Sequence, residues 1–338
     1  MNQLFPPYAL WSSDHTQSPT TPRDAMSTVP YPLIACAATS DTLVLASNSS
    51  VHVIAGGSSN SIPIPSSSAS TFIRQLAISP DSKYAVTVSN DKGLRTYDLI
   101  EKKHLSTRYL TKKPSSVTFT DKSIDGLDII VSDKVGDCYL YPLVPRDISS
   151  DKVKIMDIQA DPTLNPEATY LLGHVSVLTA HILTADEQGK WLISADRDEH
   201  IRVTRYPNTY VIERYMFGTD GFVSSIHIPK GHPELLLSAG GEGVMRIWNW
   251  KTGKQVGSID IADTVLPYRR ARSSLRKDKR KLKGKKAPAA VEGEVEGEKD
   301  FYHVPEGWML PSGQGILIRN ITTLEVGGTV IVLFYSEG

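Results

Sequence analysis

Short runs in which apolar and polar residues alternate, separated by polar turns, fill most of the chain from Leu33 onward. The clearest example is Trp191–Tyr206, WLISADRDEHIRVTRY, where apolar residues begin a strand and Ile201–Thr204 alternates like a half-buried strand. Between these two runs, Asp196–His200 places only polar residues, as a tight turn requires. Charged turns held by rigid strands often carry function, although a solvated hairpin has the same pattern.

The same pattern returns along the chain as an internal repeat with a period of about 44 residues, lengthened to about 63 where 144–170 is inserted. Each repeat contains three strand-like runs and a fourth that leads into the next repeat. Four strands per 40–45 residues are typical of a WD-type blade, so the sequence predicts an all-β fold, a WD40-type β-propeller. The aligned turn acids are Asp91, Asp198 and Glu242, and the aligned third-strand residues are Tyr97, Thr204 and Trp248.

A hydrogen-bonded network of WD type is predicted inside two blades. In the fourth blade it would join His174, Ser194 and Asp198, with Thr204 at the position where a tryptophan usually stands. The fifth blade keeps Ser238 and Trp248 for the same purpose. His174, Ser194 and Asp198 are also the side-chain types of a hydrolase triad, but the repeat favours the structural interpretation, and no G-x-S-x-G elbow is present.

Residues 1–30 are rich in Ser, Thr and Pro, which predicts a disordered N-terminus ahead of a propeller spanning 31–338. We count five blades and the first half of a sixth, so we expect this chain to be a shortened version of a longer, seven-bladed protein, missing on the order of 60–100 residues.

A strongly charged insertion at about 266–305 interrupts the propeller and is expected to be disordered. Its basic half fits three interpretations: a nuclear import signal, an arm that contacts RNA phosphates, or a solvated linker. The import signal predicts a nuclear protein. The basic residues are Arg269, Arg270, Arg272, Arg276, Lys277, Lys279, Arg280, Lys281, Lys283, Lys285 and Lys286.

Composition narrows the possible chemistry. The 338 residues carry 37 basic and 37 acidic side chains, so the global charge predicts no particular partner. Cys36 and Cys138 are too few for a disulfide framework and are expected to be buried in a protein of a reducing compartment. No secretory signal, membrane helix, metal-ligand spacing or phosphate-binding glycine loop followed by a helix is recognisable, so we predict a non-catalytic chain without metal or cofactor.

One family resemblance is specific. The block SADRDEHIRVTRYP, preceded by LLGHVSVLT and followed by LLLSAGGEG and IWNWKTGK, is similar to the WD-repeat subunit of the eukaryotic tRNA (guanine-N7) methyltransferase. The resemblance is good over about 132–260, and general WD scaffolds of ribosome assembly or ubiquitin ligases, the alternative class, lack the ADRDEHIRV block.

The resemblance implies a heterodimer. A separate subunit would bind S-adenosylmethionine and methylate N7 of a guanine in the tRNA variable loop, while this chain would hold that subunit and help to position the tRNA. The docking residues implied for this chain are Arg197, Asp198, Glu199, His200 and, above all, Arg202, whose cationic side chain would meet a partner carboxylate.

Overall fold

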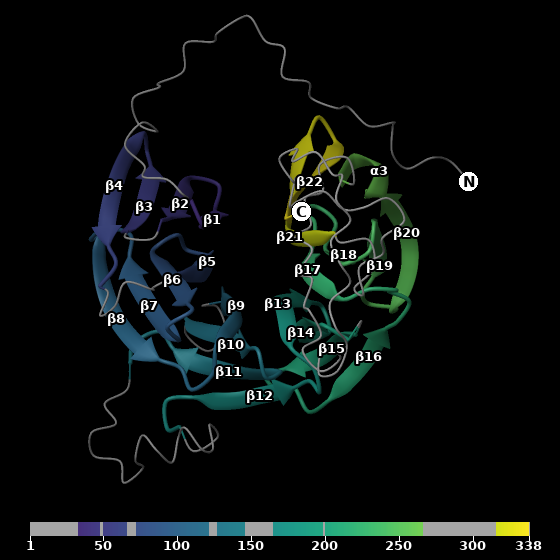
Figure 1. The fold of residues 1–338 in the computed structure, drawn as a ribbon, viewed down its shortest axis with the longest axis horizontal. Helices are drawn as coiled ribbons and strands as arrows, with labels where there is room; N and C mark the ends of the chain where they lie inside the picture. The colour runs from purple at the N-terminus through teal and green to yellow at the C-terminus, as the bar shows by residue number, and fades with distance from the viewer. Residues whose placement is uncertain are drawn as a thin grey trace, which may run out of the picture.

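The computed structural model describes residues 33–47, 50–65, 72–121, 127–145, 165–198, 200–265 and 316–337. In these residues, four-stranded antiparallel sheets follow one another around a central opening, and a two-stranded sheet follows the last of them (Figure 1). The predicted all-β, WD40-type propeller is therefore confirmed. No helix among the described residues is long and apolar enough to cross a membrane.

Each of the first three sheets runs from an innermost to an outermost strand. The first blade comprises β1 (Ala35–Ala38), β2 (Thr42–Ala46), β3 (Ser50–Ala55) and β4 (Ser58–Pro63). The second comprises β5 (Ile73–Ile78), β6 (Tyr84–Ser89), β7 (Gly93–Asp98) and β8 (Lys103–Tyr109). The third comprises β9 (Pro114–Phe119), β10 (Asp128–Asp133), β11 (Asp137–Pro142) and β12 (Thr169–Gly173).

The remaining blades repeat this order. The fourth comprises β13 (Leu178–Asp186), β14 (Gly189–Asp196), β15 (Ile201–Tyr206) and β16 (Ile212–Met216). The fifth comprises β17 (Val223–His227), β18 (Leu235–Gly240), β19 (Val244–Asn249) and β20 (Lys254–Asp260), and is followed by the single-turn helix α3 (Ala262–Val265). The sixth sheet is the hairpin of β21 (Leu317–Val326) and β22 (Thr329–Glu337).

Among the described residues, five hydrophobic clusters hold the blades together, one at each junction between neighbouring sheets. The second strands contribute to two junctions at once, because successive side chains of a strand point to opposite faces. Leu192 faces the third blade and Ile193 the fifth, while Leu236 and Leu237 divide in the same way between the fourth and sixth. These strands therefore read as continuous apolar runs, since both of their faces are buried against neighbouring blades.

Within the overall fold, the structure differs from the sequence-based expectations at two places, the segment 144–170 and Cys36. Residues 144–170 are not wholly an insertion, because they contain the start of β12, the fourth strand of the third blade. Cys138 is buried as expected, but the prediction for Cys36 is wrong: it is exposed, because the alternation along β1 turns it away from the cluster that contains Ala35 and Ala37. The N-terminal stretch 1–30 and the charged insertion 266–305 lie outside the described residues.

Candidate functional site

The charged turn of the fourth blade connects β14 to β15, as the sequence predicts. The Asp196 carboxylate fixes the turn, because its Oδ1 accepts the backbone N–H groups of Asp198 (2.9 Å) and His200 (3.1 Å). The backbone N–H of Arg197 donates to the carbonyl of Val177, which ties the turn to the chain leading into the innermost strand. The exposed side chains of Arg197 and Asp198 are thus presented by a rigid backbone.

Beneath this turn lies a buried network of three side chains. The two ring nitrogens of His174 lie 2.8 Å from Asp196 Oδ2 and 2.8 Å from the Ser194 hydroxyl. An ionised carboxylate only accepts, so Nδ1 of His174 donates to Asp196, and Nε2 of the neutral ring accepts from Ser194. Burial lowers the pKa of His174 and outweighs the hydrogen bond to Asp196, which keeps the ring neutral.

The acid of this network is Asp196, and the prediction of Asp198 is wrong in this respect. Asp196 is the last residue of β14 and lies opposite His174, whereas Asp198 stands at the tip of the turn. Burial opposes ionisation of Asp196, but the hydrogen bonds from His174 and the His200 backbone prevail and lower its pKa. Asp198 instead accepts a hydrogen bond from the Ser176 hydroxyl at 2.8 Å.

The tryptophan branch of the network is present only in the fifth of these two blades. Trp248 Nε1 donates to the Ser238 hydroxyl at 2.8 Å, as predicted. In the fourth blade the Thr204 hydroxyl donates to the Leu192 carbonyl rather than to Ser194. Ser194 has 0% of its surface exposed, so a substrate has no access to it and the hydrolase interpretation fails.

The structure contains a second repeated motif, an acid and an arginine four residues apart, that was not predicted from the sequence. In three blades an arginine follows the turn acid by four residues and stands opposite the second-strand hydroxyl. In the second and fifth blades this arginine forms an ion pair with the acid, at 2.5 Å and 2.9 Å. The spacing is visible in the sequence and would have revealed the motif. The three pairs are Asp91–Arg95, Asp198–Arg202 and Glu242–Arg246.

The fourth blade breaks this motif. Arg202 is 8% exposed, and its Nη2 donates to the Gly173 carbonyl at 2.9 Å instead of to Asp198. Among the residues that the structure describes, its buried Nε has no hydrogen-bond partner. Arg202 is therefore a largely buried cation whose hydrogen-bonding capacity is incompletely used, rather than a fully exposed docking side chain.

An exposed aromatic cluster flanks the turn, formed by His200, Tyr215 and Phe217. The rings of Tyr215 and Phe217 stack with centroids 5.5 Å apart, and His200 packs edge-on against both at 6.4 and 5.9 Å. Phe217 is 65% exposed and Tyr215 39%. Tyr215 lies on the outermost strand β16, where it pairs with Arg202, so the cluster lies at the outer edge of the fourth blade.

Of the predicted docking residues, the structure thus brings Arg197, Asp198 and His200 to the surface and buries most of Arg202. Glu199 lies outside the described residues. The aromatic members of the surface, Tyr215 and Phe217, were not predicted, because nothing in the sequence shows that β16 presents them beside the turn. No group of three His, Cys, Asp or Glu in the described part of the chain is arranged to hold a metal ion.

Blades of four antiparallel strands around an axis, with a buried Trp–Ser or His–Ser hydrogen bond inside, define a WD40 β-propeller. The family model of the tRNA methyltransferase TRM82 WD40 domain matches residues 46–169 and 156–298, and the chain belongs to this family.

Curated relatives agree with this assignment. The chain is 36% identical over 205 residues to the tRNA (guanine-N(7)-)-methyltransferase non-catalytic subunit TRM82 of Kluyveromyces lactis. It is 31% identical over 198 residues to the protein of the same name from Meyerozyma guilliermondii, and 32% over 205 residues to that of Saccharomyces cerevisiae strain RM11-1a. These matches cover 58%, 58% and 59% of this chain, but only 43%, 44% and 42% of the relatives. The chain thus spans less than half the length of the curated relatives that it matches.

Proposed function

We propose that this chain is a non-catalytic scaffold subunit of a tRNA (guanine-N7) methyltransferase. It would bind and stabilise a separate, S-adenosylmethionine-dependent catalytic subunit as a heterodimer and help to position the tRNA. The observation that carries this proposal is the family match across 46–298, together with the names of relatives that are themselves non-catalytic subunits.

The catalytic subunit would dock on the side of the fourth blade. The aromatic cluster of His200, Tyr215 and Phe217 provides exposed apolar area, and the neighbouring turn contributes the charges of Arg197 and Asp198. Interfaces of this kind combine an aromatic or arginine core with a polar rim. The physical basis is that stacked rings lose little side-chain entropy when a partner covers them, since their mutual packing already restricts them.

Arg202 would complete this interface from beneath. A partner carboxylate that reaches the edge of its guanidinium would satisfy a buried N–H that has no partner among the described residues. Such a charge-assisted bond is stronger than one between neutral groups, and is worth more in a site that docking closes to water. The interrupted ion pair of the fourth blade supports this role, because the equivalent arginines of the second and fifth blades are already engaged with their own turn acids.

The tRNA would be bound by the complex as a whole, and the protein would act in the nucleus. The basic run 269–286 supports both statements only through its composition, as an import signal or an RNA contact.

Complex formation provides the test. The chain is co-expressed with the candidate catalytic subunit, and size-exclusion chromatography shows whether the two form a complex. The Kd of that complex is measured by calorimetry. Replacing Tyr215→Ala together with Phe217→Ala is expected to weaken the complex by at least about tenfold, because both exposed rings lose their contact with the partner.

Tyr109→Ala is the matched control, since Tyr109 is a 60% exposed aromatic residue on β8, the outermost strand of another blade. Equal weakening by the control would refute docking at the fourth blade. Failure of the unmodified chain to bind any such subunit would instead favour a general WD scaffold.

A further inference from the structure

The innermost strands of the second to sixth sheets share an irregularity at one level of the propeller. Each has a register shift between its innermost strand and the next, and each shift leaves one extra residue on the innermost strand. A bulge of this kind redirects the side chain of its extra residue. The extra residues are Arg74, Ser115, Thr179, Ser224 and Arg319.

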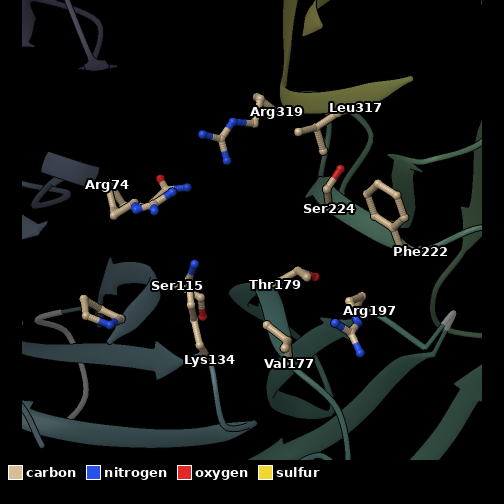
Figure 2. A pocket seen from close by; sticks show the side chains of 12 residues that line it. Arg74, Ser115, Lys134, Val177, Thr179, Arg197, Phe222, Ser224, Leu317 and Arg319 are labelled. Carbon is tan, nitrogen blue, oxygen red and sulfur yellow. The ribbon is translucent and has the colours of Figure 1, made fainter. Parts of the chain in front are cut away.

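All five line a single cavity of about 330 Å³ at the inner rim of the propeller (Figure 2). We call it the inner-rim cavity. The residues that follow the second strands of the third and fourth blades, Lys134 and Arg197, also line it. The strand bulges thus place equivalent positions of successive blades around one opening.

The three bulge hydroxyls connect neighbouring blades. Ser115 donates to the Leu178 carbonyl (2.5 Å), Thr179 to that of Val223 (2.6 Å), and Ser224 to that of Ile318 (2.5 Å). Each acceptor lies on the innermost strand of the next blade, immediately before the next bulge residue. The three hydroxyls therefore have a structural role as links between blades. The other two bulge positions carry arginine, and this structural role does not explain them.

The cavity lining is cationic and contains no acidic residue. Its charged residues are Arg74, Lys134, Arg197 and Arg319. In Figure 2, Arg74, Lys134 and Arg319 direct their nitrogen atoms toward the open centre. Arg74 is held there by its Nε, which donates to Asn90 Oδ1 at 2.7 Å.

These cations lie close enough to repel one another. Burial lowers the pKa of Lys134, and the charges of Arg74, Lys113 and Arg319 lower it further. The acids of the adjacent turns have other partners: Asp91 pairs with Arg95, and Asp133 accepts backbone N–H groups of its own turn. Like charges brought together raise the electrostatic free energy of the folded chain, and an anion bound among them would lower it.

We propose that the inner-rim cavity binds a compact polyphosphate anion, with Arg74, Arg319 and Lys134 as the phosphate ligands. Guanidinium groups suit this chemistry because their planar donors match phosphate oxygens in pairs. The cavity volume admits a small molecule that carries several phosphates, and its multiple cations favour such a ligand over a monoanion. The three proposed phosphate ligands lie at the inner rim, apart from the aromatic cluster of the fourth blade, and only Arg197 belongs both to the cavity lining and to the proposed docking turn.

Calorimetric titration of sodium tripolyphosphate into the full 338-residue chain tests the proposal, with sodium chloride at matched ionic strength as the reference. Saturable one-to-one binding is expected. The double variant Arg74→Gln, Arg319→Gln should weaken it at least tenfold, and the single exposed variant Lys134→Gln should weaken it to a smaller extent.

The matched control is Lys230→Gln with Lys254→Gln, which removes the same two charges from exposed positions outside the cavity lining. Thermal midpoints establish that each variant is folded, and Lys134→Gln alone decides the question if the arginine variant does not fold. Absence of binding, or equal weakening by the control pair, would overturn the proposal. Binding of a hexauridylate with none of tripolyphosphate would also overturn it, since the ligand would then be an RNA backbone.

Discussion

Replacing Asp196 should destabilise the propeller far more than replacing Asp198, two residues away. The Asp196 side chain is 4% exposed, and it accepts from His174 and from two backbone N–H groups of its turn. Asp196→Ala leaves these buried donors without partners. A hydrogen bond to a charged group contributes about 1.5–3 kcal/mol and the losses are not additive, so we expect a cost of about 3–5 kcal/mol in unfolding free energy.

Asp198→Ala removes one hydrogen bond, from Ser176, on a side chain that is 55% exposed. An exposed interaction of this kind contributes about 0.5–1 kcal/mol. Urea unfolding at pH 7, followed by circular dichroism, measures both variants. Asp196→Asn serves as the conservative control, because it keeps an acceptor for the turn N–H groups and should lose less than Asp196→Ala.

A larger loss for Asp198→Ala than for Asp196→Ala would refute the assignment of the buried acid. Equal and small losses for both would show that the network does not stabilise the blade.

Two further predictions concern buried cationic or titratable groups. Burial lowers the pKa of His181 to about 4 from its ordinary 6.5, so between these pH values the unfolded chain binds a proton that the folded chain does not. The free energy of unfolding should therefore fall by on the order of 3 kcal/mol as the pH drops from 6.5 to about 4. His181→Phe should make the urea midpoint less dependent on pH, whereas His232→Gln, at an exposed histidine, should not. A wild-type slope in His181→Phe would contradict this. Arg202→Leu should leave the blade folded and lower its unfolding free energy by about 1 kcal/mol, because the Gly173 carbonyl loses its hydrogen bond. The same variant should weaken binding of the proposed catalytic subunit by about 2–4 kcal/mol. Unchanged affinity in calorimetry would show that Arg202 is not part of the interface.

The repeat was predictable because blade packing leaves a strong pattern in the sequence. The second strands are apolar on successive residues, such as Leu236 and Leu237, because each side chain packs against a different neighbouring blade. The Trp248–Ser238 hydrogen bond was predictable from the repeat, since Trp248 lies two residues beyond Arg246, the partner of Ser238, and so stands diagonally across the two strands from Ser238.

The choice between Asp196 and Asp198 was not predictable from the repeat. Alignment on the third strand favours Asp198, as at Asp91 and Glu242, but the fourth blade contains a second acid two residues earlier. This second acid, Asp196, accepts a backbone N–H of the turn through one carboxylate oxygen and reaches His174 with the other. Only the geometry of the turn distinguishes the two carboxylates.

The aromatic cluster and the inner-rim cavity were harder to predict from the sequence than the repeat. The aromatic cluster joins His200 of the turn to Tyr215 and Phe217 at the end of the outermost strand, and this adjacency depends on the register of β15 against β16. The inner-rim cavity depends on bulges at Arg74 and Arg319, residues separated by most of the propeller in sequence. A bulge leaves no clear signal in a single strand, so neither surface was visible in the sequence alone.

The most direct test of the proposed function is reconstitution of guanine-N7 methylation on tRNA. The chain and the candidate catalytic subunit are purified separately and together, and transfer of a labelled methyl group from S-adenosylmethionine is followed with the modified nucleoside identified by mass spectrometry. A one-to-one complex whose activity greatly exceeds that of either protein alone is the predicted result. Full activity of the catalytic subunit alone, unchanged by this chain, would contradict the proposed scaffold role.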